Sequence, residues 1–478
     1  MFSSTRRLLA GIAAYCALTA LAQPPTSRLN PLISKVVDEV SEESIAAIMK
    51  KLESFGTRYV LSEKDSPTHG IGGAQHWIYD QFKSYSPRLQ VSYDPFTIKK
   101  SQRIPQDTDL ANVVAVLPGT VSKERYVIIG GHYDSIASRR SPGGQSAQPN
   151  DDGPRSAAET DPLAPGVADD ASGTAAVMEL ARIMSQYEFD KTIVFIAFAA
   201  EEIGLNGSAN YAKKAKEANM QIEAVLNNDI IGSDISGDGR SANGHVRVFS
   251  EGPEDSPSRA VARYTKEIAE RYVPSMTVDL IFRRDRFGRG GDHTSFVREG
   301  FAAVRLTTPS ENYANQHSAT DTFANASPAY TTRVTKINGA VLASLALAPR
   351  PPVVSRPRPA QQPPDSATQS TPGRGGRGMQ MLGRGKGYDA ALRWLAPNPE
   401  ADLAGYAIVI RSTTSALWER EIYVGNVTEF TLPGLSIDDI VLGVKAIDKD
   451  GNASLVAAYD QAPLTQQPQP QRPATQLP

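Results

Sequence analysis

Cysteine is almost absent from this chain of 478 residues, in which Cys16 is the only one. It lies in an N-terminal stretch with Arg6 and Arg7, a short apolar run and the sequence Ala20-Leu21-Ala22, which is typical of a signal peptide. We therefore predict cleavage after residue 22 and a secreted or periplasmic protein. The apolar run is too short to be a comfortable membrane span, so we expect no integral membrane segment once the signal is removed.

Removal of residues 1–22 would leave a protein with no cysteine. Its stability could then not rest on disulfides, and both a thiolate nucleophile and a cysteine-bound zinc would be excluded. Attachment of a lipid to Cys16 is a minor alternative, because Tyr15 does not suit a lipoprotein signal.

An excess of charge of either sign is also missing. The 50 Lys and Arg residues nearly balance the 52 Asp and Glu residues, and the formal net charge is -2. This balance gives no reason to expect a nucleic acid or an acidic membrane as a partner. With 40% hydrophobic and 21% charged residues, the composition is that of a soluble globular protein with room for a large core and a further domain.

Apolar runs alternate with helical patterns in residues 23–348, the larger predicted domain. Between Ser41 and Arg88 the apolar residues recur at helical spacing. Beyond them the strand-like runs are ANVVAVLPG, YVIIGGHYDS, TIVFIAFAAEE and IEAVLNNDIIG, and the helical segments are GTAAVMELARIMSQY, GSANYAKKAKEAN and PSRAVARYTKEIAERY. Strands that are apolar on both faces predict an α/β fold with a doubly wound, mostly parallel sheet between helices. The Ser-, Pro- and Gly-rich insertion 137–165 is expected to be a surface loop.

The composition changes sharply after residue 348. Residues 349–387 are rich in Pro, Gly and Arg and are predicted to be an extended, flexible linker. Residues 388–462 show short alternating runs with turn signals between them, which predicts a small antiparallel sandwich. With Trp394 in an early strand and the later runs GYAIVIR and LGVKAIDKDGN, this region resembles a fibronectin type III domain. A surface, a polymer or a protein is its candidate partner, and the Pro- and Gln-rich tail 463–478 is expected to be disordered.

Histidines and carboxylates stand at the predicted strand ends or in the loops just beyond them. Ligands of α/β sheets gather at the carboxyl ends of the strands. Two imidazoles, two terminal carboxylates and one bridging carboxylate are the set that two divalent cations would share. The mixture of nitrogen and oxygen suits zinc best, with Co²⁺ or Mn²⁺ as substitutes. The residues are His132, Asp134, Asp169, Glu201, Glu202, Asp229 and His317.

The ordered motifs GGHYDS, PGVADDASG, AAEEIG, NNDIIG, GGDHTSF and HSATD resemble the M28 family of di-zinc aminopeptidases over roughly residues 41–348. The resemblance implies a three-layer zinc exopeptidase fold, two zinc ions, and peptide or protein substrates. It also implies that His132 and Asp229 hold one zinc, that Glu202 and His317 hold the other, and that Asp169 bridges them. Glu201 would be the general base, and Asp134 would orient the His132 imidazole. Asp170 would follow Asp169 through a cis peptide.

Two positions depart from the family pattern. Gln316 stands where some relatives carry a Tyr that hydrogen-bonds the tetrahedral intermediate. The motif GGDHTSF replaces a more usual Ser-Asp-His start, so Asp292 and His293 are expected to be structural neighbours of the site.

Several alternatives to an exported zinc aminopeptidase stay open. An M28-like carboxypeptidase and a single-zinc glutaminyl cyclase keep the fold, although the full five-ligand set argues against a single zinc. An M20-like amidohydrolase would need a lid domain, for which the span from Asp229 to His317 is short. A non-catalytic exported binding protein is disfavoured by the intact Glu201–Glu202 pair.

Overall fold

The computed structural model describes residues 29–137, 162–284, 290–354, 381–385, 387–397 and 400–459. The predicted signal peptide, most of the insertion 137–165, the middle of the predicted linker and the tail 463–478 lie outside the described residues. The described chain divides into two compact units, one from Leu29 to Leu347 and the other from Ala348 onward. In this described part, no helix combines the length and apolar character that a bilayer crossing requires.

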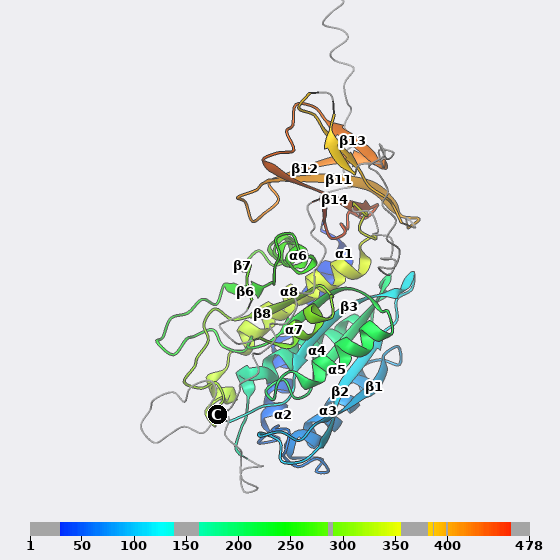
Figure 1. Cartoon of the computed structure of the whole chain (residues 1–478). Coiled ribbons are helices and arrows are strands. Elements are labelled where there is room, and N and C mark those ends of the chain that lie inside the picture. The colour runs from blue at the N-terminus through cyan, green and yellow to red at the C-terminus, as the bar shows by residue number, and fades with distance from the viewer. Residues whose placement is uncertain are drawn as a thin grey trace, which may run out of the picture. The chain divides into compact units, whose positions relative to one another are not determined.

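The first unit is built on one mixed sheet with the strand order β1-β2-β4-β3-β5-β8-β6-β7 (Figure 1). Parallel pairing joins β4 to β3, β3 to β5, β5 to β8 and β6 to β7. The pairs β1–β2, β2–β4 and β6–β8 are antiparallel. The α/β prediction is therefore confirmed, while the sheet is more mixed than predicted. The strands are β1 (Gln90–Ile98), β2 (Thr108–Leu117), β3 (Ser122–His132), β4 (Lys191–Phe198), β5 (Gln221–Asn228), β6 (His245–Phe249), β7 (Thr277–Ile281) and β8 (Ala303–Thr307).

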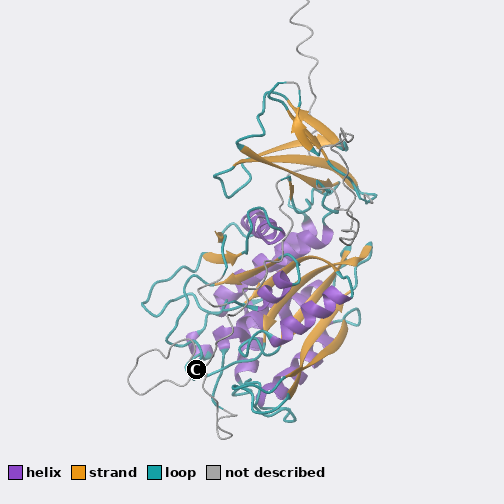
Figure 2. Cartoon of the chain, viewed as in Figure 1, coloured by secondary structure: helices purple, strands orange, loops and turns teal. Residues whose placement is uncertain are grey.

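Helices cover this sheet (Figure 2). They are α1 (Pro31–Asp38), α2 (Glu42–Glu53), α3 (Gly70–Tyr85), α4 (Ser172–Met184), α5 (Asn206–Glu217), α6 (Pro257–Tyr272), α7 (Asp292–Arg298) and α8 (Pro328–Leu347). All residues of β4 are buried. Val194, Ile196 and Phe198 pack in a core with residues of α5 and α7, while β4 also contacts α4 and α8. A strand that is buried at every position therefore lies between two helical layers, as the sequence pattern predicted.

Local signals explain where the helices begin. In α2 the Ser41 hydroxyl accepts a hydrogen bond from the Ser44 N–H, Glu42 and Glu43 occupy the first turn, and Lys50 and Lys51 the last. Capping and charge placement of this kind both favour the helix. Its buried face, which includes Ile45 and Leu52, then anchors it on the unit.

The second unit is all β, as predicted, and contains two antiparallel sheets with the orders β13-β10-β9 and β12-β11-β14-β15. Residues from both sheets form one hydrophobic core, which includes Trp394 and Tyr406. The fibronectin type III resemblance stays a prediction. The strands are β9 (Leu382–Arg384), β10 (Ala390–Arg393), β11 (Leu403–Ser412), β12 (Arg420–Gly425), β13 (Glu429–Leu432), β14 (Ile440–Asp448) and β15 (Ala457–Ala458).

Parts of the predicted linker 349–387 pair within this second unit. Val353 exchanges backbone hydrogen bonds with Leu395, and β9 pairs with β10. Residues 355–380, which form most of the predicted linker, lie outside the described residues.

Candidate metal centre

Three neighbouring parallel strands, β4, β3 and β5, end at the same edge of the sheet and carry most of the predicted site residues. The register of β4, β3 and β5 places His132 beside Phe198 and Gly130 beside Asn227. His132 is the last residue of β3, the pair Glu201–Glu202 follows β4, and Asp229 follows β5. Motifs far apart in the sequence meet here because the carboxyl ends of parallel strands lie at the same edge.

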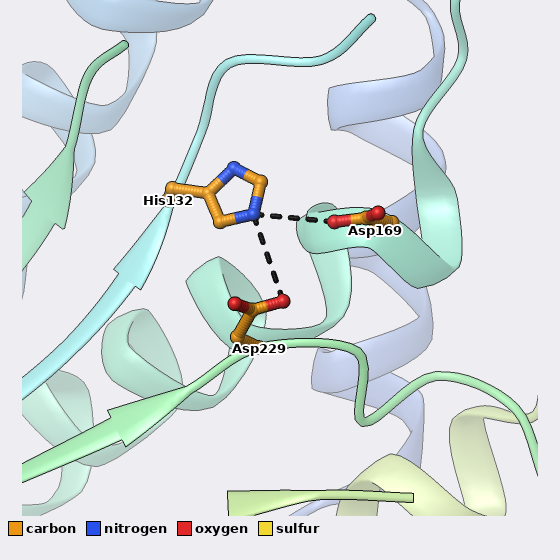
Figure 3. Close-up of side chains that lie close together, drawn as sticks. All are labelled: His132, Asp169 and Asp229. Carbon is orange, nitrogen blue, oxygen red and sulfur yellow. Dashed lines mark ion pairs between the residues drawn. The ribbon is translucent and has the colours of Figure 1, made fainter. Parts of the chain in front are cut away.

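His132, Asp169 and Asp229 form the first cluster (Figure 3). His132 Nε2 lies 3.2 Å from Asp169 Oδ1 and 3.9 Å from Asp229 Oδ1. All three side chains are buried. Asp169 comes from the bend Val167–Ala171, which leads into α4.

His317, Asp169 and Glu202 form the second cluster. His317 Nε2 lies 3.0 Å from Asp169 Oδ2 and 3.1 Å from Glu202 Oε1. Asp169 therefore turns one carboxylate oxygen toward each cluster. The His317 side chain is 29% exposed while that of His132 is 1% exposed, so the second cluster is the one nearer to solvent.

The spacing of these atoms fits two tetrahedral zinc ions. Two ligands that each lie ~2.05 Å from one tetrahedral ion are ~3.3 Å apart. The four separations given above run from 3.0 to 3.9 Å, close to that value. In addition, His132 Nε2 and Glu202 Oε1 are buried and take part in no hydrogen bond with the described residues. Both are atoms that the sequence predicts to be ligands.

The pKa values of the two histidines reflect the negative charge around them. Burial lowers the pKa of the His132 imidazole, but Asp134, Asp169 and Asp229 outweigh burial and raise it well above its ordinary value. For His317 burial acts in the same way, and Glu202 and Asp169 raise the pKa. Protons therefore occupy these imidazoles when no ion is bound, and a divalent cation must displace them.

Glu201 lies close to one member of each cluster. One carboxylate oxygen each from Glu201 and Glu202 and one nitrogen of His132 lie within 4.8 Å of one another. Burial raises the pKa of the Glu201 carboxyl well above its ordinary value, and the neighbouring charges of Asp229 and Glu202 add to the increase. A carboxyl group with a raised pKa suits a residue that takes up and returns a proton.

Asp134 holds the glutamate pair more directly than it holds His132. Its Oδ1 accepts a hydrogen bond from the Glu201 N–H at 3.1 Å, and its Oδ2 accepts one from the Glu202 N–H at 3.2 Å. His132 Nδ1 lies 3.1 Å from the Asp134 backbone carbonyl and 3.5 Å from Asp134 Oδ1. The predicted contact with the imidazole is thus present, but the carboxylate also fixes the backbone of both glutamates, which the sequence did not predict.

Asp170 joins three elements at the base of the site. The peptide between Asp169 and Asp170 is cis, which agrees with the expectation from the resemblance. The buried Asp170 carboxylate accepts backbone hydrogen bonds from His132, Gly173 and Ile230 at 3.1, 2.9 and 3.2 Å. It therefore holds the end of β3, the start of α4 and the residue after Asp229 together.

Backbone conformation also brings neighbouring side chains together. Ala200 and Ile230, which lie next to Glu201 and Asp229, have φ values of 60° and 61°, and His317 itself has 53°. Non-glycine residues adopt this left-handed conformation at a cost of ~1–2 kcal/mol, and such residues concentrate at functional sites. At Ala200 it breaks the alternation of a strand, so that two consecutive glutamates can face the same centre.

Sequence reasoning missed three residues that hold the site. Asp321 accepts hydrogen bonds from the N–H groups of Ala168 and Asp169 at 2.8 and 3.1 Å, which orients the shared ligand. Arg305 Nη2 lies 3.1 Å from Asp229 Oδ1. Arg58 is fully buried, and its guanidinium donates to the carbonyls of Leu52, Tyr133, Pro165 and Gly166. Asp321 closes the motif HSATD and could have been found there, whereas the two arginines carry no such signal.

The remaining histidines and Asp292 take no part in the two clusters. Asp292 and His293 are fully buried at the start of α7, and no hydrogen bond from the described residues reaches either carboxylate oxygen or either ring nitrogen. Burial raises the pKa of Asp292 to about 7 and lowers that of His293 to about 4. His69 precedes α3, while His76 and His245 are exposed.

Gln316 lies directly against the shared ligand. Its Nε2 donates to Asp169 Oδ2 at 3.1 Å. This is the oxygen that faces His317, so the residue at the position where relatives carry a Tyr contacts the second cluster.

Comparison with known proteins identifies related chains. A model described as Peptidase family M28 matches residues 112–342. A probable zinc metalloprotease of Leptosphaeria maculans is 35% identical over 451 residues, which span 87% of this chain and 94% of that protein. Another, from Pyrenophora teres f. teres, is 33% identical over 467 residues, which span 90% of this chain and 86% of that protein.

A solved structure has a similar fold. LapB of Legionella pneumophila shows a TM-score of 0.51 at 20% identity and covers 72% of this chain and 83% of that chain. The matched family segment contains every predicted metal ligand, from His132 to His317.

Proposed function

This chain is a zinc metalloprotease of peptidase family M28, and from that premise we propose that it is an exported aminopeptidase that uses two zinc ions. The position of Asp169 carries the proposal. Its two carboxylate oxygens face two different histidines, each of which has a further carboxylate beside it. Membership of this family removes the M20-like alternative.

Each predicted site residue would have one role. His132 and Asp229 would hold one ion, Glu202 and His317 the other, and Asp169 would be shared. Bound zinc would acidify a water molecule and polarise the scissile carbonyl. Glu201 would accept the water proton and return it to the leaving amine. Asp134 acts as a positioning residue, because its carboxylate fixes the backbone of Glu201 and Glu202.

The charge around the site favours a substrate with a free amine over one with a free carboxylate. The described residues that line the hollow beside Asp169 include Glu311 and Asp321 and no Lys or Arg. Of the cations near the clusters, Arg305 is paired with Asp229, Arg58 donates to four carbonyls, and Arg103 donates to the backbone carbonyl of Glu202. A substrate α-carboxylate would therefore need a cation that these lining residues do not supply, whereas a substrate amine would not.

Two substrates test the direction of cleavage. The 4-nitroanilide of an amino acid should be hydrolysed, and its N-acetylated form should not, because acetylation removes the positive charge. A carboxypeptidase would instead release residues from an N-blocked peptide with a free carboxyl terminus. That result would exclude the aminopeptidase.

Metal content and export have separate tests. Protein purified without chelator should contain two equivalents of zinc, and a clean single equivalent would favour the single-zinc cyclase alternative. N-terminal sequencing of protein recovered from outside the cytoplasm should begin at Gln23 if residues 1–22 are a signal peptide.

A further inference from the structure

A shallow hollow that is open to solvent lies beside the shared ligand. It encloses about 310 Å³, including space that is open to solvent. Because Asp169 and Gln316 form part of its wall, a substrate whose scissile carbonyl lies at the two clusters has this hollow within reach of a neighbouring group.

Amide side chains dominate the wall of the hollow. Asn312, Asn315, Gln316 and Asn325 all line it. The Oδ1 atom of Asn312 accepts a hydrogen bond from the Ala314 N–H at 3.1 Å, and that of Asn315 accepts one from the Thr320 hydroxyl at 3.0 Å. These bonds use the oxygen of each amide and fix its orientation. No described residue accepts a hydrogen bond from the Nδ2 group of Asn312 or Asn315, so both donors are available to a ligand.

Besides the shared ligand Asp169, the wall has two carboxylates, and both are already engaged. Glu311 is 6% exposed and lies 3.9 Å from Arg247 Nη1. Both oxygens of Asp321 accept backbone hydrogen bonds from Ala168 and Asp169. The wall therefore offers amide donors, together with acceptors such as the Asn325 side-chain oxygen, but little unbalanced charge.

We infer that this hollow receives the side chain of the substrate's N-terminal residue and selects an uncharged side chain that both donates and accepts hydrogen bonds, glutamine and asparagine above all. The inference rests on the proposed aminopeptidase function. A side-chain carbonyl would accept from Asn312 and Asn315, whereas an apolar side chain would cover these donors and leave them unsatisfied. An acidic side chain would face Glu311, and a basic one would find the carboxylates of Glu311 and Asp321 already engaged.

Isosteric variants test the inference without disturbing the loop. Asn312→Asp and Asn315→Asp keep the oxygen that holds each turn and replace the Nδ2 donor by a second carboxylate oxygen. The matched control is Asn426→Asp, which makes the same change of charge at an exposed position in the second unit. The assay is kcat/KM for the 4-nitroanilides of glutamine, leucine, lysine and glutamate, with zinc content and thermal unfolding measured for every variant.

The unaltered protein should prefer the glutamine substrate over the leucine substrate by about tenfold or more, as expected for donors that an apolar group leaves unpaired. Each Asn→Asp variant in the hollow should lower the ratio of glutamine to lysine turnover at least about tenfold, while Asn426→Asp leaves it unchanged. Zinc content should not change in any variant.

The contrary results are distinct. Equal or faster turnover of the leucine or lysine substrate by the unaltered protein would overturn the inference and leave the aminopeptidase standing. Unchanged ratios in both variants of the hollow would overturn it as well. Turnover of none of the four substrates would refute the aminopeptidase and the inference together.

Discussion

Replacement of Asp134 by Asn should weaken zinc binding although Asp134 is not a predicted ligand. The Asp134 carboxylate accepts one hydrogen bond from each of the Glu201 and Glu202 N–H groups, at 3.1 and 3.2 Å. Asparagine keeps one acceptor oxygen and turns an NH₂ group toward the other N–H. The variant therefore loses one hydrogen bond to a charged acceptor and leaves a donor unpaired.

The magnitude follows from that loss. A hydrogen bond to a charged group contributes ~1.5–3 kcal/mol, and 1.4 kcal/mol corresponds to about tenfold in a binding constant. If the cost falls on the conformation that holds Glu202 in place, zinc affinity should fall roughly 10- to 100-fold, which is the range found when partners of metal ligands are replaced. Turnover should fall as well, because Glu201 depends on the same carboxylate.

The assay is a competition titration of zinc-free protein with a chromophoric chelator, accompanied by thermal unfolding. Asp448→Asn is the matched control. Asp448 is buried in the second unit, where its Oδ1 accepts from the N–H groups of Asp450 and Asn452 at 2.9 and 2.8 Å, and its Oδ2 accepts from Asn452 Nδ2 at 2.7 Å, the bond that asparagine would lose. The control should lose stability and keep its zinc affinity. Zinc affinity of Asp134→Asn within twofold of the unaltered protein would refute the reasoning.

Three further predictions concern the glutamates, pH and the second unit. Glu201→Gln should retain zinc and lose about 10²–10⁴-fold in kcat, because it removes only the base, whereas Glu202→Gln should also lose zinc from one site; identical behaviour in metal analysis would contradict this division of roles. The pKa values of His132 and His317 are raised in the zinc-free protein, so zinc binding releases protons from both imidazoles. Zinc affinity should therefore continue to rise with pH above the ordinary imidazole pKa, until the raised pKa values are passed. A zinc affinity that does not change with pH in the chelator titration would contradict this prediction. Truncation after Ala348 should leave kcat/KM on a small aminoacyl substrate nearly unchanged, because every predicted site residue precedes Ala348. A drop of more than about tenfold corresponds to ~1.4 kcal/mol of transition-state stabilisation. Such a drop in a folded, zinc-loaded protein would show that the second unit supports catalysis.

Sequence patterns predicted the central elements because burial on both faces leaves a clear signature. Every position of β4 is apolar or buried, and its end is marked by Glu201 and Glu202. Strands with weaker patterns escaped: β1 is mostly exposed or half-buried, and β7 has only five residues. The bridge between Val353 and Leu395 lies at the border of a Pro-rich stretch, and one isolated pair produces no periodic pattern.

The metal site also contains residues that the sequence could predict and residues that it could not. His132, Glu202 and Asp229 could be predicted because polar residues at the ends of apolar runs stand out. Asp169 and His317 were predicted as ligands through the resemblance of their motifs, and the structure brings all five together. The double contact of Asp134 with the glutamate backbone could not be predicted, because it depends on the left-handed conformation of Ala200. Arg58 escaped for a related reason, since its partners are backbone carbonyls, which every sequence contains.

Because Asp169 lies between two histidines, the affinities of the two proposed zinc ions would not be independent. An ion held at one cluster would fix the orientation of the carboxylate that the other cluster also needs, and it would add positive charge a few ångströms from the second position. The two effects oppose each other, and their sum is a coupling free energy. By linkage, the factor by which an ion at His132 changes affinity at His317 equals the factor in the reverse direction. Replacement of Glu202 should therefore also change zinc affinity at the cluster of His132, because both clusters use the Asp169 side chain.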